Sequence, residues 1–324
     1  KMKIILVILL LIGLSHANLE EEFESFKQIF NKIYKDVTEH DQRKQIFKDN
    51  SELISQHNEL HAAGGKSYKM GINQFSDLHS EEFQQLMLSS INSTDFTTGI
   101  HQIFTPSSSV QIPDSIDWRE KGAVTGVKDQ GGCGSCWAFA TIGTLEGQNF
   151  IKNQQLVSLS EQNLVDCSKN DGGCQGGWPD NALNYIKDNG GVDTEDSYPY
   201  EAKDGECRFN PEHIGAKVTD IVVVASDDES ALATAVAEKG PISVAVDASF
   251  FQHYQGGILD EPSCQGGVNH GVVVVGYGHD DTGGDYWLVK NSWGTSWGEN
   301  GYVRMARNKN NQCKIASHGV YPLV

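Results

Sequence analysis

The chain reads Asp129-Gln130-Gly131-Gly132-Cys133-Gly134-Ser135-Cys136-Trp137 in the stretch that says most about its fold. The glycines predict a tight loop. Apolar residues then recur at helical spacing, at Phe139, Ile142, Leu145 and Phe150. We therefore expect Cys136 at the N-terminus of a helix, where unpaired N–H groups and the helix dipole favour a thiolate. The thiolate is the form of cysteine that acts as a nucleophile.

Three other roles fit the pair Cys133-x-x-Cys136 when it is taken alone. It could be a redox pair, although no strand of the thioredoxin kind precedes it. It could be half of a zinc site, although Cys167 and Cys174 do not form a second closely spaced pair. It could also be purely structural. The stretch alone leaves these alternatives open.

Length and charge limit the class of protein. The chain has 324 residues and a formal net charge of −18. This length predicts about two packed units plus attached segments. The acidic excess argues against nucleic acid, because a nucleic-acid binder needs a basic face to replace phosphate counterions. It also argues against binding to an anionic membrane surface.

The first residues predict targeting to the secretory pathway. Lys1 and Lys3 precede an apolar run from Ile4 to Leu14, and a small-x-small cleavage pattern ends at Ala17. The run is too short to span a bilayer, so we expect a signal peptide over residues 1–17 rather than a signal anchor. An oxidising compartment then allows disulfides. All seven cysteines follow residue 132, and an odd number leaves one thiol unpaired or paired between chains.

A thiol nucleophile needs a base, and the base needs a group that orients it. Five histidines follow residue 112, and His270 is distinctive because it opens a buried-strand pattern from Val272 to Gly276. A histidine in that position is more often an ordinary core residue. Asn291 ends a second apolar strand, and its amide could fix the imidazole tautomer while Trp293 shields the bond from water.

The segment before residue 112 predicts helices and a linker. Residues 18–63 have the pattern of two helices, with a capping pattern at Thr38 and Asp41 before the second. One face of that second helix mixes polar and apolar groups, namely Glu39, Arg43, Phe47, Asn50, Ile54 and Asn58. The alternating residues 71–77 predict a short strand. Residues 89–109 are rich in Ser and Thr, contain a glycosylation acceptor at Asn92, and predict an exposed linker open to proteolysis.

Taken together, these features resemble the papain family of cysteine proteases. The stretch Cys133-Gly134-Ser135-Cys136-Trp137 with a distant His and Asn carries the resemblance. The helix face given above, together with Gly71, Asn73, Phe75 and Asp77, resembles the two propeptide motifs of the cathepsin L-like branch. The resemblance implies that Cys136 is the nucleophile, His270 its ion-pair partner and Asn291 the orienting group. It implies that Gln130 donates to the oxyanion, and it selects the disulfides Cys133–Cys174, Cys167–Cys207 and Cys264–Cys313.

The resemblance also implies a fold and its boundaries. We expect an α+β, two-lobe papain-like enzyme at residues 112–324, with a helical lobe at about 121–221 and a β-barrel-like lobe at about 222–321. Residues 18–111 would form a helical inhibitory propeptide with its linker. Strands are expected around 222–224, 243–246, 272–276, 287–290 and 302–305. Neither a metal nor another cofactor is implied.

For the substrate, the resemblance implies an extended peptide lying along Gly176 and Gly177. The pocket for the second residue before the cut would involve Trp178, Pro179, Ala245, Val268, Gly271 and His318, with Trp293 nearby. His318 departs from the usual small residue. It could point to solvent, or it could floor the pocket and, when charged at acid pH, admit polar or acidic side chains.

The resemblance predicts an endopeptidase that is made as a zymogen and loses its propeptide at acid pH. We expect a monomer that acts on proteins and peptides, is inhibited by its own propeptide, and is open to cystatin-type inhibitors. It would pass through the secretory pathway to a lysosome or be exported for digestion. A non-catalytic relative that acts as a binder or inhibitor is the alternative. Titration with a thiol-directed epoxide distinguishes the two functions.

Overall fold

A computed structural model describes residues 19–88, 102–107 and 112–324. The predicted signal peptide, Asn92 and most of the predicted linker lie outside these residues. The described helices are residues 19–29, α2 (Val37–Ala62), α3 (Ser80–Met87), α4 (Cys136–Asn153), α5 (Glu161–Cys167), α6 (Pro179–Asn189) and α7 (Glu229–Lys239). Short 3₁₀ helices are η1 (Gly173–Gln175), η2 (Pro211–His213) and η3 (Gln312–Lys314). None of the helices in this part of the chain is both long and apolar enough to cross a membrane.

The strands of the main sheet are β1 (Tyr68–Met70), β2 (Gln102–Ile103), β3 (Ile116–Asp117), β6 (Asp220–Val224), β7 (Ile242–Val246), β8 (Tyr254–Leu259), β9 (His270–Asp280), β10 (Gly284–Lys290), β11 (Tyr302–Ala306) and β12 (Gly319–Leu323). Nine of them follow the order β1-β8-β11-β10-β9-β7-β12-β6-β2, while β3 pairs with β9. The pairs β8–β11 and β2–β6 are parallel, and the other neighbours are antiparallel. A separate pair joins β4 (Val192–Asp193) to β5 (Ile214–Ala216).

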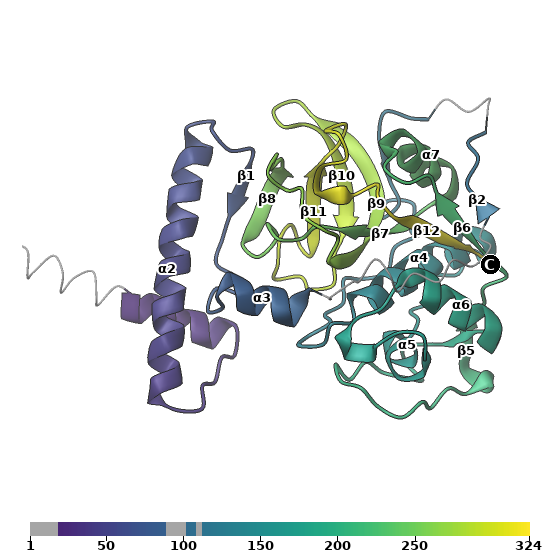
Figure 1. Cartoon of the computed structure of the whole chain (residues 1–324), viewed down its shortest axis with the longest axis horizontal. Helices are drawn as coiled ribbons and strands as arrows, with labels where there is room; N and C mark the ends of the chain where they lie inside the picture. The colour runs from purple at the N-terminus through teal and green to yellow at the C-terminus, as the bar shows by residue number, and fades with distance from the viewer. Residues whose placement is uncertain (1–18, 89–101, 108–111) are drawn as a thin grey trace, which may run out of the picture.

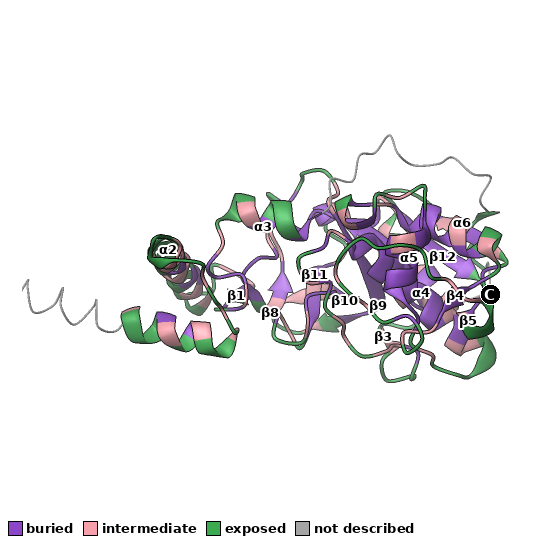
Figure 2. Cartoon of the chain, turned by 90° about the horizontal axis from the view of Figure 1, so that it is seen from below, coloured by how far each residue is buried: buried purple, intermediate pink, exposed green. Residues whose placement is uncertain are grey.

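The segment before residue 112 extends this sheet at both ends. It supplies β1 at one end and β2 at the other. Figure 1 shows α2 and α3 beside β1 and β8, while β2 lies at the far side of the molecule. Figure 2 shows that α2 stands away from the main body and is mostly exposed, whereas α4 and β9 are buried. The front segment is therefore attached through β1, α3 and β2 rather than enclosed.

Helices α4 to α6 gather in one half of the molecule and most strands in the other (Figure 1). One core joins α4 and α6 to β6 and β12 through Ile142, Leu145, Leu183 and Val320. A larger core lies among the strands and includes Trp287 and Trp297. The two cores correspond to the helical and β-rich halves expected from the sequence. The five predicted strands are confirmed as β6, β7, β9, β10 and β11.

Small residues on one face of α4 let the helix pack closely on the strands. A Cβ atom added to Gly143 would lie 2.8 Å from Val273 of β9, and one added to Gly147 would lie 2.6 Å from Pro241. Each of these distances is too short for a normal contact, so a side chain there would push the helix away. The face therefore fixes α4, and the residue at its N-terminus, against the β-rich half.

A buried group of charges lies behind this contact. The Lys128 ammonium donates to both carboxylate oxygens of Glu161 at 2.7 and 2.9 Å and to Glu146 at 3.3 Å. The Thr125 hydroxyl also donates to Glu146. Lys290 of β10 donates to the same hydroxyl at 2.9 Å, and burial lowers the pKa of its ammonium. Residues from both halves thus share one ionic network.

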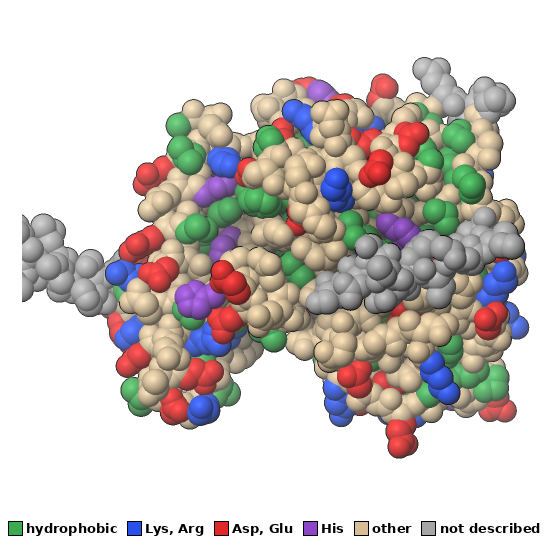
Figure 3. All heavy atoms as spheres, viewed as in Figure 1, with side chains coloured by type: hydrophobic (Ala, Val, Ile, Leu, Met, Phe, Trp, Pro, Cys, Tyr) green, Lys and Arg blue, Asp and Glu red, His purple; other side chains and the backbone are tan. Residues whose placement is uncertain are grey.

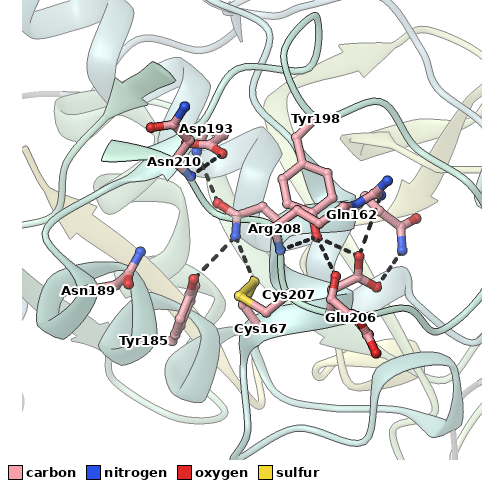
Figure 4. Close-up of a disulfide and its surroundings, with 12 residues drawn as sticks. Gln162, Cys167, Tyr185, Asn189, Asp193, Tyr198, Glu206, Cys207, Arg208 and Asn210 are labelled. Carbon is pink, nitrogen blue, oxygen red and sulfur yellow. Dashed lines mark hydrogen bonds and ion pairs between the residues drawn. A yellow bond between two sulfur atoms is a disulfide. The ribbon is translucent and has the colours of Figure 1, made fainter. Parts of the chain in front are cut away.

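Three disulfides close loops in residues 112–324, namely Cys133–Cys174, Cys167–Cys207 and Cys264–Cys313. These are the pairs that the resemblance implied. Figure 4 shows Cys167–Cys207 between Tyr185 of α6 and the loop that carries Tyr198 and Arg208. The Tyr198 hydroxyl donates to Asp166 at 2.6 Å and accepts from the Arg208 backbone N–H at 3.1 Å.

Two local predictions were wrong. The N-cap of α2 is Asp36, whose carboxylate accepts from the Glu39 backbone N–H at 2.9 Å, so Thr38 lies inside the helix. Residues 71–77 do not form a strand. The Asn73 side chain accepts from the Phe75 backbone N–H at 2.9 Å, and this bond turns the chain instead. The strand is β1, immediately before this turn.

Candidate active site

Cys136 is the first residue of α4 and is fully buried. Among the seven cysteines, all of which lie in the described part of the chain, it alone is outside a disulfide. Its Sγ accepts a hydrogen bond from the Gly271 backbone N–H at 3.3 Å. The helix N-terminus and this N–H both favour a negative charge on sulfur.

His270 begins β9, and Asn291 directly follows β10. The imidazole Nε2 is 2.7 Å from the Asn291 side-chain oxygen. The Ser292 backbone N–H donates to the same oxygen at 2.8 Å, so this atom is an acceptor and Nε2 must carry the proton. The other ring nitrogen, Nδ1, is buried and has no hydrogen-bond partner among the described residues. It is the nitrogen that remains for a thiol.

Aromatic packing shields the pair of His270 and Asn291 from water. The Trp293 ring lies 4.7 Å from the imidazole, centroid to centroid, and is fully buried. The next residue after His270 is Gly271, where an added Cβ would lie 3.1 Å from the Cys136 carbonyl oxygen. A side chain at this position would crowd the start of α4, so glycine favours the close approach of β9. The predicted nucleophile and base therefore come from adjacent backbones.

Gln130 is fully buried beside the same loop. Its side-chain oxygen accepts from the Ser292 hydroxyl at 2.7 Å and from the Trp293 indole N–H at 3.2 Å. These two donors settle which end of the amide is the oxygen. Its amide nitrogen donates to the Cys133 carbonyl at 3.0 Å and to the Met87 carbonyl at 3.3 Å. No local sequence pattern indicated the Ser292 and Met87 contacts.

The front segment packs against this site. Phe75 and Phe83 each meet the Trp293 ring edge to face, with centroid distances of 5.4 and 5.3 Å. Gln74 donates to the Trp293 carbonyl at 2.7 Å. The Met87 carbonyl accepts from Gln130, as noted above. Residues 74–87 therefore cover the tryptophan and use a hydrogen-bond donor of the site.

The mixed face of α2 holds the turn at residues 70–78 through polar side chains. Arg43 forms a two-bond ion pair with Glu82 of α3, at 2.8 and 3.0 Å, and also donates to the Asp77 carbonyl. Asn50 donates to the carbonyls of residues 76 and 78, and Asn58 exchanges two bonds with Met70. Arg43, Asn50 and Asn58 of the predicted motif thus anchor the turn that contacts the part of the chain after residue 112.

The remaining motif residues complete this contact. Asp77 is buried and accepts from Lys32 at 2.8 Å and from Tyr34 at 2.9 Å. Asn73 donates to the Gln252 carbonyl at 2.7 Å, and Gly71 donates its N–H to the His253 carbonyl. Phe47 and Ile54 are buried on the inner face of α2. Glu39, in the first turn of α2, accepts a hydrogen bond from the Lys35 backbone N–H.

The predicted substrate side lies next to Cys136. The Gly177 backbone packs closely against Trp137. A Cβ atom added to Gly177 would lie only 2.7 Å from the indole ring. The next backbone N–H, from Trp178, donates to Asp171 at 2.8 Å, and burial raises the pKa of that carboxyl to about 6. Gly176 precedes this pair with a positive φ of 121°, and Pro179 begins α6.

His318 does not point freely into solvent. Its Nε2 is 2.5 Å from a carboxylate oxygen of Asp180, and its ring meets Trp178 edge to face at 4.9 Å. Asp180 is fully buried. The His318 carbonyl accepts from Ala245, which pairs with Gly271 in the sheet. Val268 is half-buried in the loop before β9. Sequence patterns gave no indication of Asp180.

Comparison with known proteins decides the family. The model for "papain family cysteine protease" matches residues 112–323, and that for "cathepsin propeptide inhibitor domain (I29)" matches residues 23–83. The chain belongs to the papain family of cysteine proteases. The protease is 51% identical to cathepsin L of Sarcophaga peregrina over all of both chains. It is 49% identical to digestive cysteine proteinase 1 of Homarus americanus, covering 98% of this chain and 99% of the other.

Solved structures agree with this assignment. The digestive procathepsin L 3 of the Tenebrio molitor larval midgut superposes on the protease with a TM-score of 0.87 at 42% identity, covering 94% of this chain and 99% of the other. The protease is thus a cathepsin L-like cysteine endopeptidase made as a zymogen with an inhibitory propeptide. The predicted papain-like fold is confirmed.

Acidic and basic side chains are interspersed on the face seen in Figure 3.

Proposed function

We propose that Cys136, His270, Asn291 and Gln130 perform the proteolysis. The Cys136 thiolate attacks the substrate carbonyl, and His270 gives its proton to the leaving amine as the C–N bond breaks. Water then hydrolyses the thioester with His270 as base. Asn291 orients the imidazole, and Gln130 with the Cys136 backbone N–H stabilises the oxyanion.

The bond from His270 Nε2 to Asn291 carries this proposal. It leaves Nδ1 as the nitrogen for the thiol, and it lies under the buried Trp293 ring, where water does not compete. The test is titration of the acid-activated protein with a thiol-directed epoxide, with Cys136→Ala as control. Stoichiometric labelling that abolishes peptide cleavage is expected. A non-catalytic binder would show neither, and labelling without loss of cleavage would exclude this mechanism.

We further propose that Gln130 is an oxyanion donor that the propeptide occupies in the zymogen. The Met87 carbonyl takes the hydrogen bond that a developing oxyanion would receive. Replacing an oxyanion donor lowers kcat by about 10²–10³ in other enzymes. Gln130→Ala of the activated protein should lose a similar factor, with KM little changed. An unaltered kcat would remove Gln130 from the mechanism.

Acid activation is proposed from the ion pair of Arg43 and Glu82. The hydrogen bond from Arg43 lowers the pKa of Glu82, so this pair stabilises the closed propeptide above the ordinary carboxyl pKa. The stabilisation fades as pH falls through the lowered pKa. Cleavage near Ile112, before Pro113, would then release the propeptide. N-terminal sequencing after acid treatment tests that boundary.

The pocket for the second residue before the cut is proposed to include Trp178, Pro179, Ala245, Val268, Gly271 and His318, with the substrate backbone on Gly176 and Gly177. The contact with Asp180 modifies our expectation for charge. The Asp180 carboxylate would balance a positive charge on His318, so the pocket should take apolar side chains.

A substrate series varied at that residue tests the neutral pocket. Wild-type preference between acidic and apolar side chains should not change between about pH 4.5 and pH 7. Asp180→Asn should gain a preference for acidic side chains at the lower pH, because His318 then lacks its counter-charge. Acid-dependent selectivity in the wild type would contradict the neutral pair.

We propose that the protease works as a monomer in a lysosome or a digestive secretion, where cystatin-type inhibitors would meet it. Its relatives support both settings, since they include a cathepsin L and a digestive cysteine proteinase. Light scattering of the activated protein tests the monomer. A shift in mass on treatment with an N-glycosidase tests a glycan on Asn92.

A further inference from the structure

The Tyr200 hydroxyl connects the two ends of the loop between Gln130 and α4. It donates to the Gln130 carbonyl at 2.8 Å and is 2.6 Å from the Ser135 hydroxyl. Ser135 is the residue before Cys136 and is the N-cap of α4. One side chain from a distant loop therefore holds both the residue proposed to stabilise the oxyanion and the residue that leads into the nucleophile.

The hydrogen bonds in this chain all have the same donor-to-acceptor direction. A tyrosine hydroxyl has a single proton, and the Gln130 carbonyl can only accept. The Ser135 hydroxyl must therefore donate to the Tyr200 oxygen. The Ser135 hydroxyl also lies 3.4 Å from the Cys133 carbonyl, a second and longer acceptor for its proton. The hydrogen bonds of Tyr200 restrain the peptide planes at both ends of the loop.

The tyrosine is itself held in place. Its ring meets Phe139 edge to face at 4.9 Å, one turn along α4 from Cys136, and its backbone N–H donates to Glu195 at 3.0 Å. Burial raises the pKa of Tyr200, and the charge of Cys136 adds to that rise. The hydroxyl therefore stays protonated at working pH and lies within electrostatic reach of the nucleophile.

We propose that Tyr200 is a positioning residue that holds the oxyanion donors in place through Gln130 and Ser135. Its hydroxyl touches neither the substrate nor the reacting sulfur in this scheme. It fixes the Gln130 peptide, and hence the aim of the Gln130 amide, and it fixes the N-cap, and hence the Cys136 backbone N–H. The proposal rests on the role of Gln130 proposed above.

Tyr200→Phe in the acid-activated protein removes the hydroxyl and keeps the ring on Phe139. We expect kcat to fall about tenfold, less than the loss of a whole oxyanion donor, with KM within about twofold. Alkylation of Cys136 by iodoacetamide needs no oxyanion donor and should stay within about twofold of wild type. Parallel losses in alkylation and kcat would show general distortion and overturn the proposal.

Tyr198→Phe is the matched control. This tyrosine is two residues away, is buried, and donates to Asp166 beside the Cys167–Cys207 disulfide rather than to the catalytic loop (Figure 4). Both variants lose one hydrogen-bonded hydroxyl, so thermal unfolding should be similar, but only Tyr200→Phe should lose turnover. Equal kcat for both variants would refute the proposal.

A double variant separates this proposal from the role of Gln130. On a Gln130→Ala background, Tyr200→Phe should reduce kcat by less than it does in the wild type, because the part of its effect that passes through Gln130 is already lost. If Gln130→Ala alone leaves kcat unchanged, the proposed oxyanion donor fails. If Gln130→Ala loses rate and Tyr200→Phe does not, only the positioning role fails.

Discussion

Phe83→Ala should open the zymogen without acid. Phe83 lies on α3 of the propeptide, is fully buried, and meets the Trp293 ring of the enzyme edge to face at 5.3 Å. Removing a buried phenylalanine costs about 3–5 kcal/mol. Some of that loss falls on Phe75, a neighbour within the propeptide itself, which Phe83 meets at 5.3 Å. We assign about 2–3 kcal/mol to the contact with the enzyme, which corresponds to about 30–150-fold in the open population.

The assay is labelling of Cys136 in the intact zymogen by a peptidyl epoxide near neutral pH. Such a reagent needs an open cleft, so its rate follows the open population. Intact mass restricts the count to full-length chains and excludes self-processed enzyme. Phe83→Ala should label about 30–150 times faster than wild type. Leu86→Ala, on the same helix but 46% exposed, is the control and should label at the wild-type rate.

A labelling rate for Phe83→Ala within about twofold of wild type would refute this reasoning. It would mean that contacts other than the aromatic group on Trp293 close the zymogen. Equal acceleration by both variants would instead indicate that any change in α3 unfolds the helix. Circular dichroism of the two zymogens distinguishes that outcome.

Three further predictions concern other contacts. In the Glu82→Gln zymogen, Cys136 should be labelled about two- to fivefold faster near neutral pH, because the partly exposed ion pair with Arg43 contributes only about 0.5–1 kcal/mol. The increase in labelling rate as pH falls should also be smaller than in wild type, and an unchanged pH profile would contradict this. Asn291→Ala should lower kcat by about tenfold and narrow the pH range over which kcat is high, since His270 loses the oxygen that accepts its Nε2 proton. A pH profile of kcat like that of wild type would exclude the orienting role. Lys128→Met should destabilise the protein by about 3–5 kcal/mol in urea unfolding, because it removes the ammonium that donates to buried Glu161 and Glu146. A loss below about 1 kcal/mol would show that these ion pairs contribute little to stability.

Local sequence patterns predicted the elements that carry the proposed catalytic residues. The Cys136 helix, the strand opened by His270 and the strand before Asn291 each have a pattern within a dozen residues. The turn at residues 71–77 was missed because the Asn73 side chain accepts from the Phe75 backbone N–H, and a period-two pattern does not report such local bonds. The polar residues on α2 were visible, but their partners were not.

The contacts that regulate and aim the site had no local signal. Met87 reaches Gln130 through a backbone carbonyl, which every residue has, so no side-chain pattern marks it. Asp180 meets His318 across 138 positions of the chain. Tyr200 joins the ends of the catalytic loop from 65 and 70 positions away.

Residue types and their spacing along the chain, together with the family resemblance that they carry, predicted the kind of chemistry, because a thiol at a helix start, an imidazole at a strand start and an amide after a strand are each encoded within their own segment. The packing of α4 on β9 decided which atoms meet, since Cys136 and Gly271 are 135 positions apart and only the folded sheet brings them to 3.3 Å. The closed state of the zymogen depends on the same packing, because the propeptide acts on Trp293 and Gln130 through surfaces that exist only once both halves of the enzyme have assembled.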